Sequence, residues 1–296
     1  MAERTKTPSL AQERLLRLSF NAMSAFESKN AYWDFANTVK TERRFIFDGK
    51  AGNFLAAVRV ASKSRAYVLK PGSRLYRAQV GSDFVERPIG DGGEETGIEE
   101  EQPLPDTRMI PDPKYIKNGG RANPPGFPYL YLADRPETAL AEMRPWVGES
   151  LTLAIFEIQQ NTKLVVCKFG DEDLGERLFE ENPSVEKLDK YVWDDISRAF
   201  ARPVNREDQD YAYLPTQILA ETFKAEGFDG LVYRSGLECG TNAVLFDVRF
   251  AKVIHRFVYT LKKVRYDFEA VPNYGIYRQK AGDGQYITEI HTESPK

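Results

Sequence analysis

The sequence predicts a globular protein that combines helices with β-strands, in which a helical N-terminal region precedes a core of strands and helices. Three observations support this fold. Residues 9–70 carry apolar side chains at roughly helical spacing, and several short segments after residue 74 alternate apolar with polar side chains, as strands do. The chain of 296 residues is 42% hydrophobic and 12% aromatic, which is enough to bury a sizeable core without disulfides.

The composition argues against several classes of function. A net charge of −3 gives no general attraction to nucleic acid or anionic lipid. No apolar run approaches the roughly 20 residues of a membrane helix, and the first residues, MAERTKTPSL, lack the apolar centre of a secretion signal. We therefore expect a cytoplasmic location, with no membrane and no nucleic-acid partner. The two cysteines, Cys167 and Cys239, suggest neither a disulfide framework nor a metal site, and the two histidines, His255 and His291, support neither a zinc enzyme nor a histidine-dependent hydrolase.

The N-terminal region is predicted to be mainly helical because Leu15, Leu18, Met23 and Phe26 recur at helical spacing. The same character resumes in residues 54–58, after a break at residues 48–52. We interpret this region as a helical cap packed on the core, and favour a scaffolding role over a partner-binding one.

The first core strand is predicted at residues 74–78, where alternation places Leu75 and Arg77 on one face. An arginine that shares a face with a buried leucine is costly unless an anion pairs with it. Either a ligand phosphate or an internal carboxylate could serve. Residues 85–107 form an insertion rich in glycine and acid, for which an exposed, mobile loop that repels phosphates is favoured over a metal site.

The segment 119–144, GGRANPPGFPYLYLADRPETALAEMR, combines turn signals, a short strand and a short helix. In residues 129–132, alternation places the two leucines on one face and the two tyrosines on the other. Asp134 is predicted as the N-cap of the helix, with Glu137 completing a capping box. Glu142 then falls in the last turn, where the helix dipole disfavours a carboxylate by about 0.3–1 kcal/mol. Spacing alone favours a solvated Glu142 paired with Arg144 or Arg135.

The pattern of apolar residues in the second half of the chain predicts further strands and helices. Strands are expected at residues 151–158, 164–167, 231–233, 243–246, 248–260 and 264–268, and helices within residues 170–200 and 215–226. Trp193 is assigned to the core. Arg249 and His255 have a spacing seen in some helical ribonucleases, but their β-branched and aromatic surroundings predict a strand, so we discount that interpretation. Small polar residues in the loop 235–242 suit the approach of a ligand to the backbone, or an ordinary turn.

Five motifs, in order along the chain, resemble the signature of the RES-domain family. They are LYRA at 75–78, GGRANPPG with LYLA, PETALAEMRP, YLPTQILAE at 213–221 and GFDGLVYRSGLECGTNAVLFD at 227–247. The resemblance implies an α+β fold with an ADP-ribosyltransferase-like core of mixed and antiparallel sheets. The expected organisation is a helical region at 1–70, a catalytic core at 71–255 with the acidic insertion at 85–107, and a C-terminal β extension and tail at 256–296.

The resemblance also implies an enzyme that consumes NAD by cleaving its nicotinamide–ribose bond, by phosphorolysis or hydrolysis. NAD would be the substrate and inorganic phosphate a co-substrate, with no cofactor and no metal. Many members of the family are toxins restrained by an antitoxin, so an antitoxin or another regulatory protein is an expected partner, and a homo-oligomer is left open. Two alternatives are transfer of ADP-ribose to a macromolecule and a non-catalytic module that binds nucleotides.

Site residues follow from the resemblance, residue by residue. Glu142 is expected to be the catalytic carboxylate, with Arg77 on the pyrophosphate and Ser235 hydrogen-bonded to the ligand near the reacting ribose. Glu137 competes for the catalytic role, but its predicted capping function already accounts for it. The resemblance also suggests three substrate-binding residues. Arg121 would be a second pyrophosphate contact, Tyr131 would lie against nicotinamide or its ribose, and Asn242 would support the loop of the serine.

Overall fold

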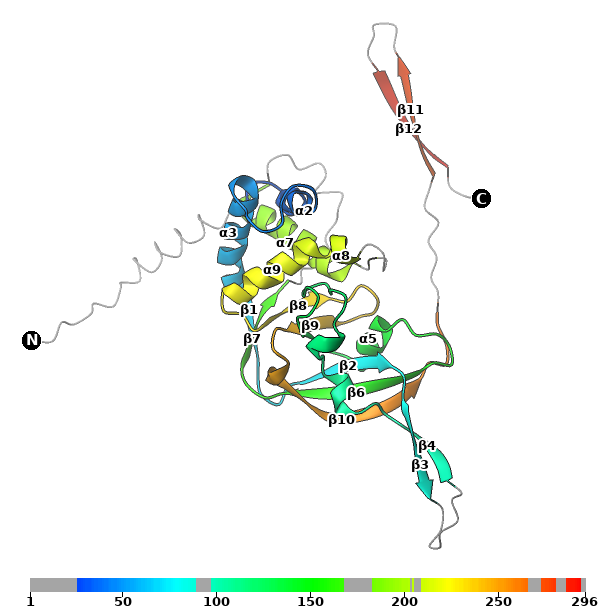
Figure 1. The fold of residues 1–296 in the computed structure, drawn as a ribbon. Coiled ribbons are helices and arrows are strands. Elements are labelled where there is room, and N and C mark those ends of the chain that lie inside the picture. Colours follow the sequence, from blue (N-terminus) through cyan, green and yellow to red (C-terminus); the bar gives the residue numbers. More distant parts are fainter. Residues whose placement is uncertain are drawn as a thin grey trace, which may run out of the picture. The chain divides into compact units, whose positions relative to one another are not determined.

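The computed structural model describes residues 26–88, 97–167, 183–202, 204, 209–265, 273–280 and 286–293. The chain divides into two compact units, residues 1–261 and 262–296, and each is considered by itself. Figure 1 shows the elements of both units along the chain.

The first unit is built on one eight-stranded sheet in the order β1-β7-β8-β9-β5-β2-β6-β10. Its strands are β1 (Ala66–Leu69), β2 (Arg74–Val80), β5 (Leu130–Ala133), β6 (Ser150–Ile158), β7 (Thr162–Val166), β8 (Gly230–Arg234), β9 (Thr241–Leu245) and β10 (Ala251–Thr260). Strands β7 and β8 run parallel, and the other neighbours in this sheet pair antiparallel. With the helices described below, this sheet confirms the predicted α+β class with a mixed, mainly antiparallel sheet.

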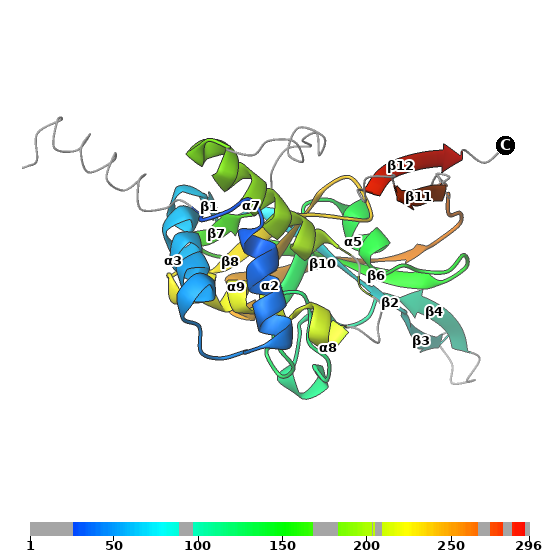
Figure 2. The ribbon, with the colours of Figure 1, turned by 90° about the horizontal axis from the view of Figure 1, so that it is seen from above.

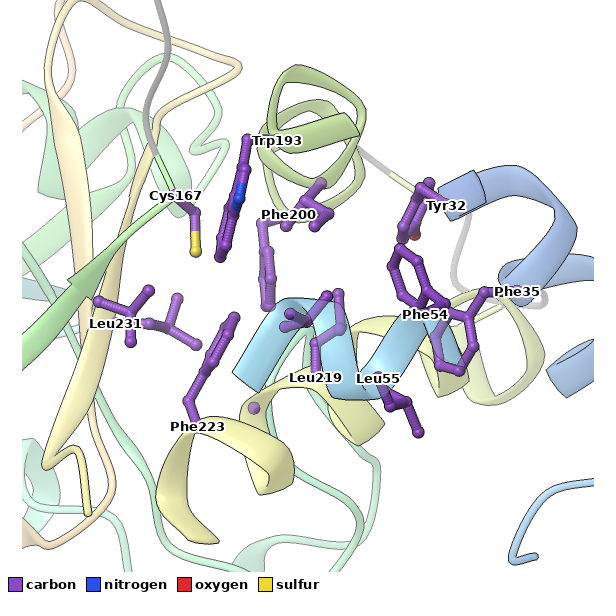
Figure 3. Packing of buried hydrophobic residues seen from close by; sticks show 14 of the residues in the cluster. Tyr32, Phe35, Phe54, Leu55, Cys167, Trp193, Phe200, Leu219, Phe223 and Leu231 are labelled. Carbon is purple, nitrogen blue, oxygen red and sulfur yellow. The ribbon is translucent and has the colours of Figure 1, made fainter. Parts of the chain in front are cut away.

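Four helices pack together over the β1, β7 and β8 end of the sheet (Figure 2). They are α2 (Ala31–Thr41), α3 (Gly49–Ser64), α7 (Val185–Ala201) and α9 (Leu214–Ala225). Figure 3 shows their aromatic contacts, among which Trp193 of α7 stacks on Phe223 of α9 at 6.1 Å between ring centroids. The structure therefore confirms Trp193 as a core residue. It also confirms helices in the N-terminal region, at α2 and α3, but the break predicted at residues 48–52 is wrong for 49–52, which open α3, and residues 66–69 form β1. Residues 1–25 lie outside the described part of the chain.

A second core cluster contains Leu75, Met109, Leu130, Leu132 and Phe156. Tyr129 and Tyr131 belong instead to the helical cluster, so the alternation predicted for this strand is confirmed. The other helices in the described residues of this unit are short: α4 (Asp106–Met109), α5 (Pro136–Glu142), α8 (Gln209–Ala212), η1 (Pro113–Tyr115) and η3 (Val248–Phe250).

The acidic insertion differs from its prediction as a loop. Its ends form an antiparallel hairpin of β3 (Asp83–Pro88) and β4 (Gly97–Gln102), and residues 89–96 lie outside the described part. Glu99, Glu100 and Glu101 are exposed, as predicted. Like charges do not prevent a ladder here because the backbone supplies the pairing while the carboxylates face solvent. The loop prediction was wrong for the paired residues.

Strand pairing also sets boundaries that differ from those read from the sequence. β1 lies within the region 1–70, yet it pairs with β7 of the main sheet. The boundary at 255/256 falls inside β10, which pairs with β6 from Ala251 to Thr260, and Val248–Phe250 is a 3₁₀ turn. Residues 264 and 265 are not in a strand, and 266–268 lie outside the described part.

The second unit contains one antiparallel hairpin of β11 (Asn273–Lys280) and β12 (Tyr286–Glu293). Among the described residues of the whole chain, no helix is long and apolar enough to cross a membrane.

Candidate active site

The candidate site lies where two neighbouring strands of the sheet diverge. β2 pairs with β6 from Arg74 to Val80, but it joins β5 through the single pair Tyr76–Ala133. A cavity of about 680 Å³ opens beside this divergence, a volume in the usual range for small-molecule sites. Five of the six predicted site residues line it: Arg77, Arg121, Tyr131, Glu142 and Asn242.

Glu142 lies in the last turn of α5, as the sequence predicted, and is the last residue of that helix. Its carboxylate is held by three side chains. Ser235 Oγ donates a hydrogen bond of 2.9 Å to Glu142 Oε1, and Asn242 Nδ2 donates one of 2.6 Å to the same oxygen. Arg121 Nη1 lies 3.7 Å from Oε2, with only 12% of the Arg121 side chain and 18% of the Glu142 side chain exposed. The ion pair therefore forms with Arg121 and not with Arg144 or Arg135.

The two carboxylate oxygens of Glu142 have different environments. Oε1 accepts both hydrogen bonds, which fixes the plane of the carboxylate. Among the described residues, Oε2 accepts no hydrogen bond and faces Arg121 across a distance longer than a hydrogen bond. Oε2 is therefore the oxygen with free lone pairs for a ligand.

Helix α5 begins differently from the predicted capping box. Its N-cap is Arg135, with no side-chain capping hydrogen bond. The carboxylate of Asp134 instead accepts hydrogen bonds from Thr241 N at 2.8 Å and Thr241 Oγ1 at 2.9 Å. The prediction was wrong because β9 runs beside β5, which brings Thr241 to Asp134 from 107 residues away. Glu137 is exposed and is not part of the cavity lining.

The loop after β8 is fastened to α5 at both ends of the helix. Near the start of α5, Thr138 Oγ1 donates to Cys239 O at 3.0 Å. A Cβ at Gly240, whose φ is 150°, would lie 2.3 Å from Thr138 Oγ1, so this approach requires glycine. At the end of α5, Glu142 accepts from Ser235, which is itself buried and does not line the cavity. A single short helix thus places both the carboxylate and the serine.

Arg121 comes from the glycine-rich turn before β5. Its Nη1 donates to Tyr233 OH at 3.3 Å, and its guanidinium lies 5.7 Å from the Tyr233 ring centroid. Burial acts to lower the pKa of Arg121, but Tyr233 and Glu142 outweigh it, so the pKa lies above its ordinary value. Arg121 remains a cation, and in this structure its partners are Tyr233 and the candidate catalytic carboxylate.

Tyr131 lies on the cavity side of β5, but its hydroxyl is already engaged. It accepts from Ala122 N at 2.9 Å and donates to Asn123 Oδ1 at 2.7 Å. Burial raises the pKa of the Tyr131 phenol. The hydroxyl therefore holds the glycine-rich turn, and the ring is the part of Tyr131 that a ligand can meet.

Arg77 is a cation of the cavity whose Nε has no hydrogen-bond partner in the described part of the chain. This Nε is buried. Burial lowers the pKa of Arg77 to about 10, so the side chain stays charged at neutral pH. No described carboxylate pairs with it, which favours a ligand anion over an internal one.

Several residues of the site were not identified from the sequence. Tyr233 contacts Arg121, and Tyr76 and Tyr213 also line the cavity. These three tyrosines stand within the motifs quoted above, but a tyrosine in an apolar strand or just before a helix gives no local sign that it faces a cavity. Gln217, which binds the turn that carries Arg121, and Asn123, which belongs to that turn, gave no such sign either.

Other candidate chemistry is not supported by the geometry. His255 lies in β10, as the rejection of the helical ribonuclease motif required. Cys167 is buried and Cys239 exposed, both as free thiols. Within the described ranges, no group of three or more histidine, cysteine or acidic residues is arranged to hold a metal ion.

Comparisons with known proteins place this chain in a family. No curated protein matches the chain. Among solved structures, the crystal structure of the M. tuberculosis MbcT–MbcA toxin–antitoxin complex is similar, with 12% identity and a TM-score of 0.35, over 69% of this chain and 92% of that one. The model of the RES domain matches residues 105–269, more than half of the chain and including Arg121, Glu142 and Ser235. This chain belongs to the RES domain family.

Proposed function

We propose that this protein consumes NAD by cleaving the bond between nicotinamide and ribose. The observation that carries the proposal is Glu142, a largely buried carboxylate fixed by Ser235 and Asn242 in a cavity that also holds a buried arginine with free hydrogen-bonding capacity. Nicotinamide is a cationic leaving group on the ribose and departs as a neutral molecule. No general acid has to protonate it, and one carboxylate can suffice where a glycoside hydrolase usually needs two.

The geometry suggests how Glu142 acts. Its Oε2 has free lone pairs, and a negative charge there stabilises the oxocarbenium-like transition state or fixes the hydroxyls of the adjacent ribose. Ser235 and Asn242 hold Oε1, so little reorganisation is needed when positive charge develops on the sugar. Arg121 offsets the cost of a carboxylate in this partly buried place.

Arg77 is the proposed contact of the pyrophosphate. A guanidinium suits phosphate oxygens through bidentate hydrogen bonds, and a buried one gains most from an anionic partner. The rings of Tyr76, Tyr131, Tyr213 and Tyr233 line the same cavity, and such rings can stack on nicotinamide or adenine.

Nicotinamide release from NAD by the purified protein tests the proposal. The Glu142→Gln variant keeps an acceptor for Ser235 and Asn242 but removes the charge, so we expect the rate to fall by about 100- to 1000-fold. Glu137→Gln is the matched control, because Glu137 lies on the same helix, is exposed and does not line the cavity. Wild-type protein that releases no nicotinamide, with or without phosphate, would refute the proposal.

The acceptor of the ADP-ribosyl group is tested in the same assay. A rate that rises with inorganic phosphate, with a phosphorylated sugar product, identifies phosphorolysis, and a phosphate-independent rate identifies hydrolysis. NAD labelled in its adenosine half separates these two reactions from transfer to a macromolecule. Phosphorolysis and hydrolysis leave the label in small molecules, whereas transfer attaches it to the macromolecule. An antitoxin-like partner is proposed from the family resemblance alone. It predicts that a second protein co-purifies with this one and suppresses nicotinamide release.

A further inference from the structure

The turn that carries Arg121 is held by one side chain from helix α9. The turn is closed by a hydrogen bond of 2.8 Å from Gly120 N to Asn123 O. Gln217 Nε2 donates to Gly120 O at 2.8 Å and to Asn123 O at 3.1 Å. One amide group therefore bridges both ends of the four-residue turn in which Arg121 stands second.

The opposite side of the turn is held by β5. Tyr131 OH bridges Ala122 N and Asn123 Oδ1, at 2.9 and 2.7 Å. The fit leaves no room for adjustment: a Cβ at Gly119 would lie 2.8 Å from Gln217 Nε2, and one at Gly120 would lie 2.6 Å from Tyr131 OH. This close approach explains the glycine pair, because contacts under 3.0 Å require a neighbour to shift.

Gln217 is buried, at 8% exposure, and it does not line the cavity. Its amide binds the backbone of the turn, and the position of that backbone determines where the side chain of Arg121 starts. Beyond the turn, Arg121 is guided by a long hydrogen bond of 3.3 Å to Tyr233. A small displacement of the turn would therefore change the distance of 3.7 Å between Arg121 and Glu142 directly.

We propose that Gln217 is a positioning residue for the reaction, which acts through the turn on Arg121 and through Arg121 on Glu142. This inference rests on the proposed function, since it assumes that Glu142 stabilises the transition state. It links helix α9, which packs among the N-terminal helices, to the carboxylate. It predicts that losing the amide slows the chemical step while substrate affinity, which we assign to Arg77, is kept.

The experiment measures nicotinamide release by Gln217→Leu, by Arg121→Ala and by the double variant. A misplacement of about 1 Å can cost about 100-fold in rate, so we expect kcat of Gln217→Leu to fall by about 10- to 100-fold. The KM for NAD should stay within about threefold of wild type, because the lost interaction belongs to the transition state. The double variant should be no slower than Arg121→Ala alone, because both changes disrupt the same interaction, that of Arg121 with Glu142.

A control on the same helix separates positioning from loss of stability. Thr222→Val also removes a buried side-chain hydrogen bond of α9, from Thr222 Oγ1 to Ile218 O, but Thr222 does not contact the turn. It should keep the wild-type kcat. If Gln217→Leu does not fold, Tyr131→Phe, which removes the hydroxyl from the other side of the turn, replaces it in the same cycle.

Two results would overturn the inference while leaving the proposed function intact. One is a wild-type kcat in Gln217→Leu, and the other is a double variant whose loss is the product of the two single losses. Wild-type protein that shows no turnover would overturn both the inference on Gln217 and the proposed function, because Arg121 would then orient no catalytic group.

Discussion

Replacing Arg77 by methionine should make the ligand-free protein more stable and greatly weaken its binding of NAD. Arg77 is half-buried and its Nε is fully buried without a partner among the described residues; burial lowers the pKa of Arg77 to about 10. The ordinary arginine pKa is about 12.5, and each pKa unit corresponds to about 1.4 kcal/mol, so burying the charge costs up to about 3 kcal/mol. Methionine has a similar length and carries no charge, and we expect a gain of about 1–3 kcal/mol in the free energy of unfolding.

The sign of the pH dependence follows from the same shift. The unfolded chain holds the proton on Arg77 more tightly than the folded one does, so the penalty is fully present below pH about 10 and is relieved as the pH rises through that value. The stability difference between variant and wild type should therefore be constant from about pH 6 to about pH 9 and should shrink above about pH 10.

Urea unfolding of the ligand-free proteins measures the stability, and titration with NAD in the Glu142→Gln background measures binding with turnover slowed. We expect affinity to fall at least about 30-fold, equivalent to about 2 kcal/mol, when the buried cation is removed. Arg74→Met is the matched control, because Arg74 is exposed on the same strand and should change stability by less than about 0.5 kcal/mol. An Arg77→Met protein that is less stable than wild type, or that binds NAD equally well, would refute the reasoning.

Two further predictions concern the groups that hold Glu142 and Arg121. Ser235→Ala and Asn242→Ala each remove one hydrogen bond to the charged Oε1 of Glu142, worth about 1.5–3 kcal/mol. Nicotinamide release should therefore slow by about 10- to 100-fold in each variant. A wild-type rate in both variants would show that Oε1 needs no support. Gly120→Ala introduces a Cβ 2.6 Å from both Asn123 Oδ1 and Tyr131 OH, and should lower the free energy of unfolding by about 1–3 kcal/mol and reduce kcat; unchanged values in thermal unfolding and turnover would contradict the tight fit of the turn.

The strands and helices that could be predicted are those whose signals are local. The alternation in residues 129–132 placed Tyr131 and Leu132 on the correct faces, and the Pro136 and Pro145 signals bounded a short helix that ends at Glu142. Glu142 attracted attention because a carboxylate at that end of a helix has no local reason. The family resemblance named Ser235, Asn242 and Arg121 as site residues, Arg121 as a contact of the pyrophosphate and Asn242 as a support of the serine loop, and the structure brings all three to Glu142.

What could not be predicted depends on pairs that are distant in the chain. Asp134 has every local property of an N-cap, but its carboxylate binds Thr241 because β9 lies beside β5. Gln217 is likewise an unremarkable polar residue within a helix until the turn at Gly120 is placed against it. Charge density misled the prediction for the acidic insertion, because a ladder depends on backbone groups that composition does not report.

The place of β2 in the sheet has a consequence for where this protein can be cut. The family match begins at residue 105, after β2, although β2 lies between β5 and β6. A fragment trimmed to the matched residues would lose a central strand. β6 would keep its pairing with β10 but lose its pairing with β2 from Leu151 to Glu157, and the apolar side chains that Leu75 packs against would be uncovered. The matched residues and the smallest folding unit therefore do not coincide here, and Arg77, which lines the cavity, lies outside the matched residues.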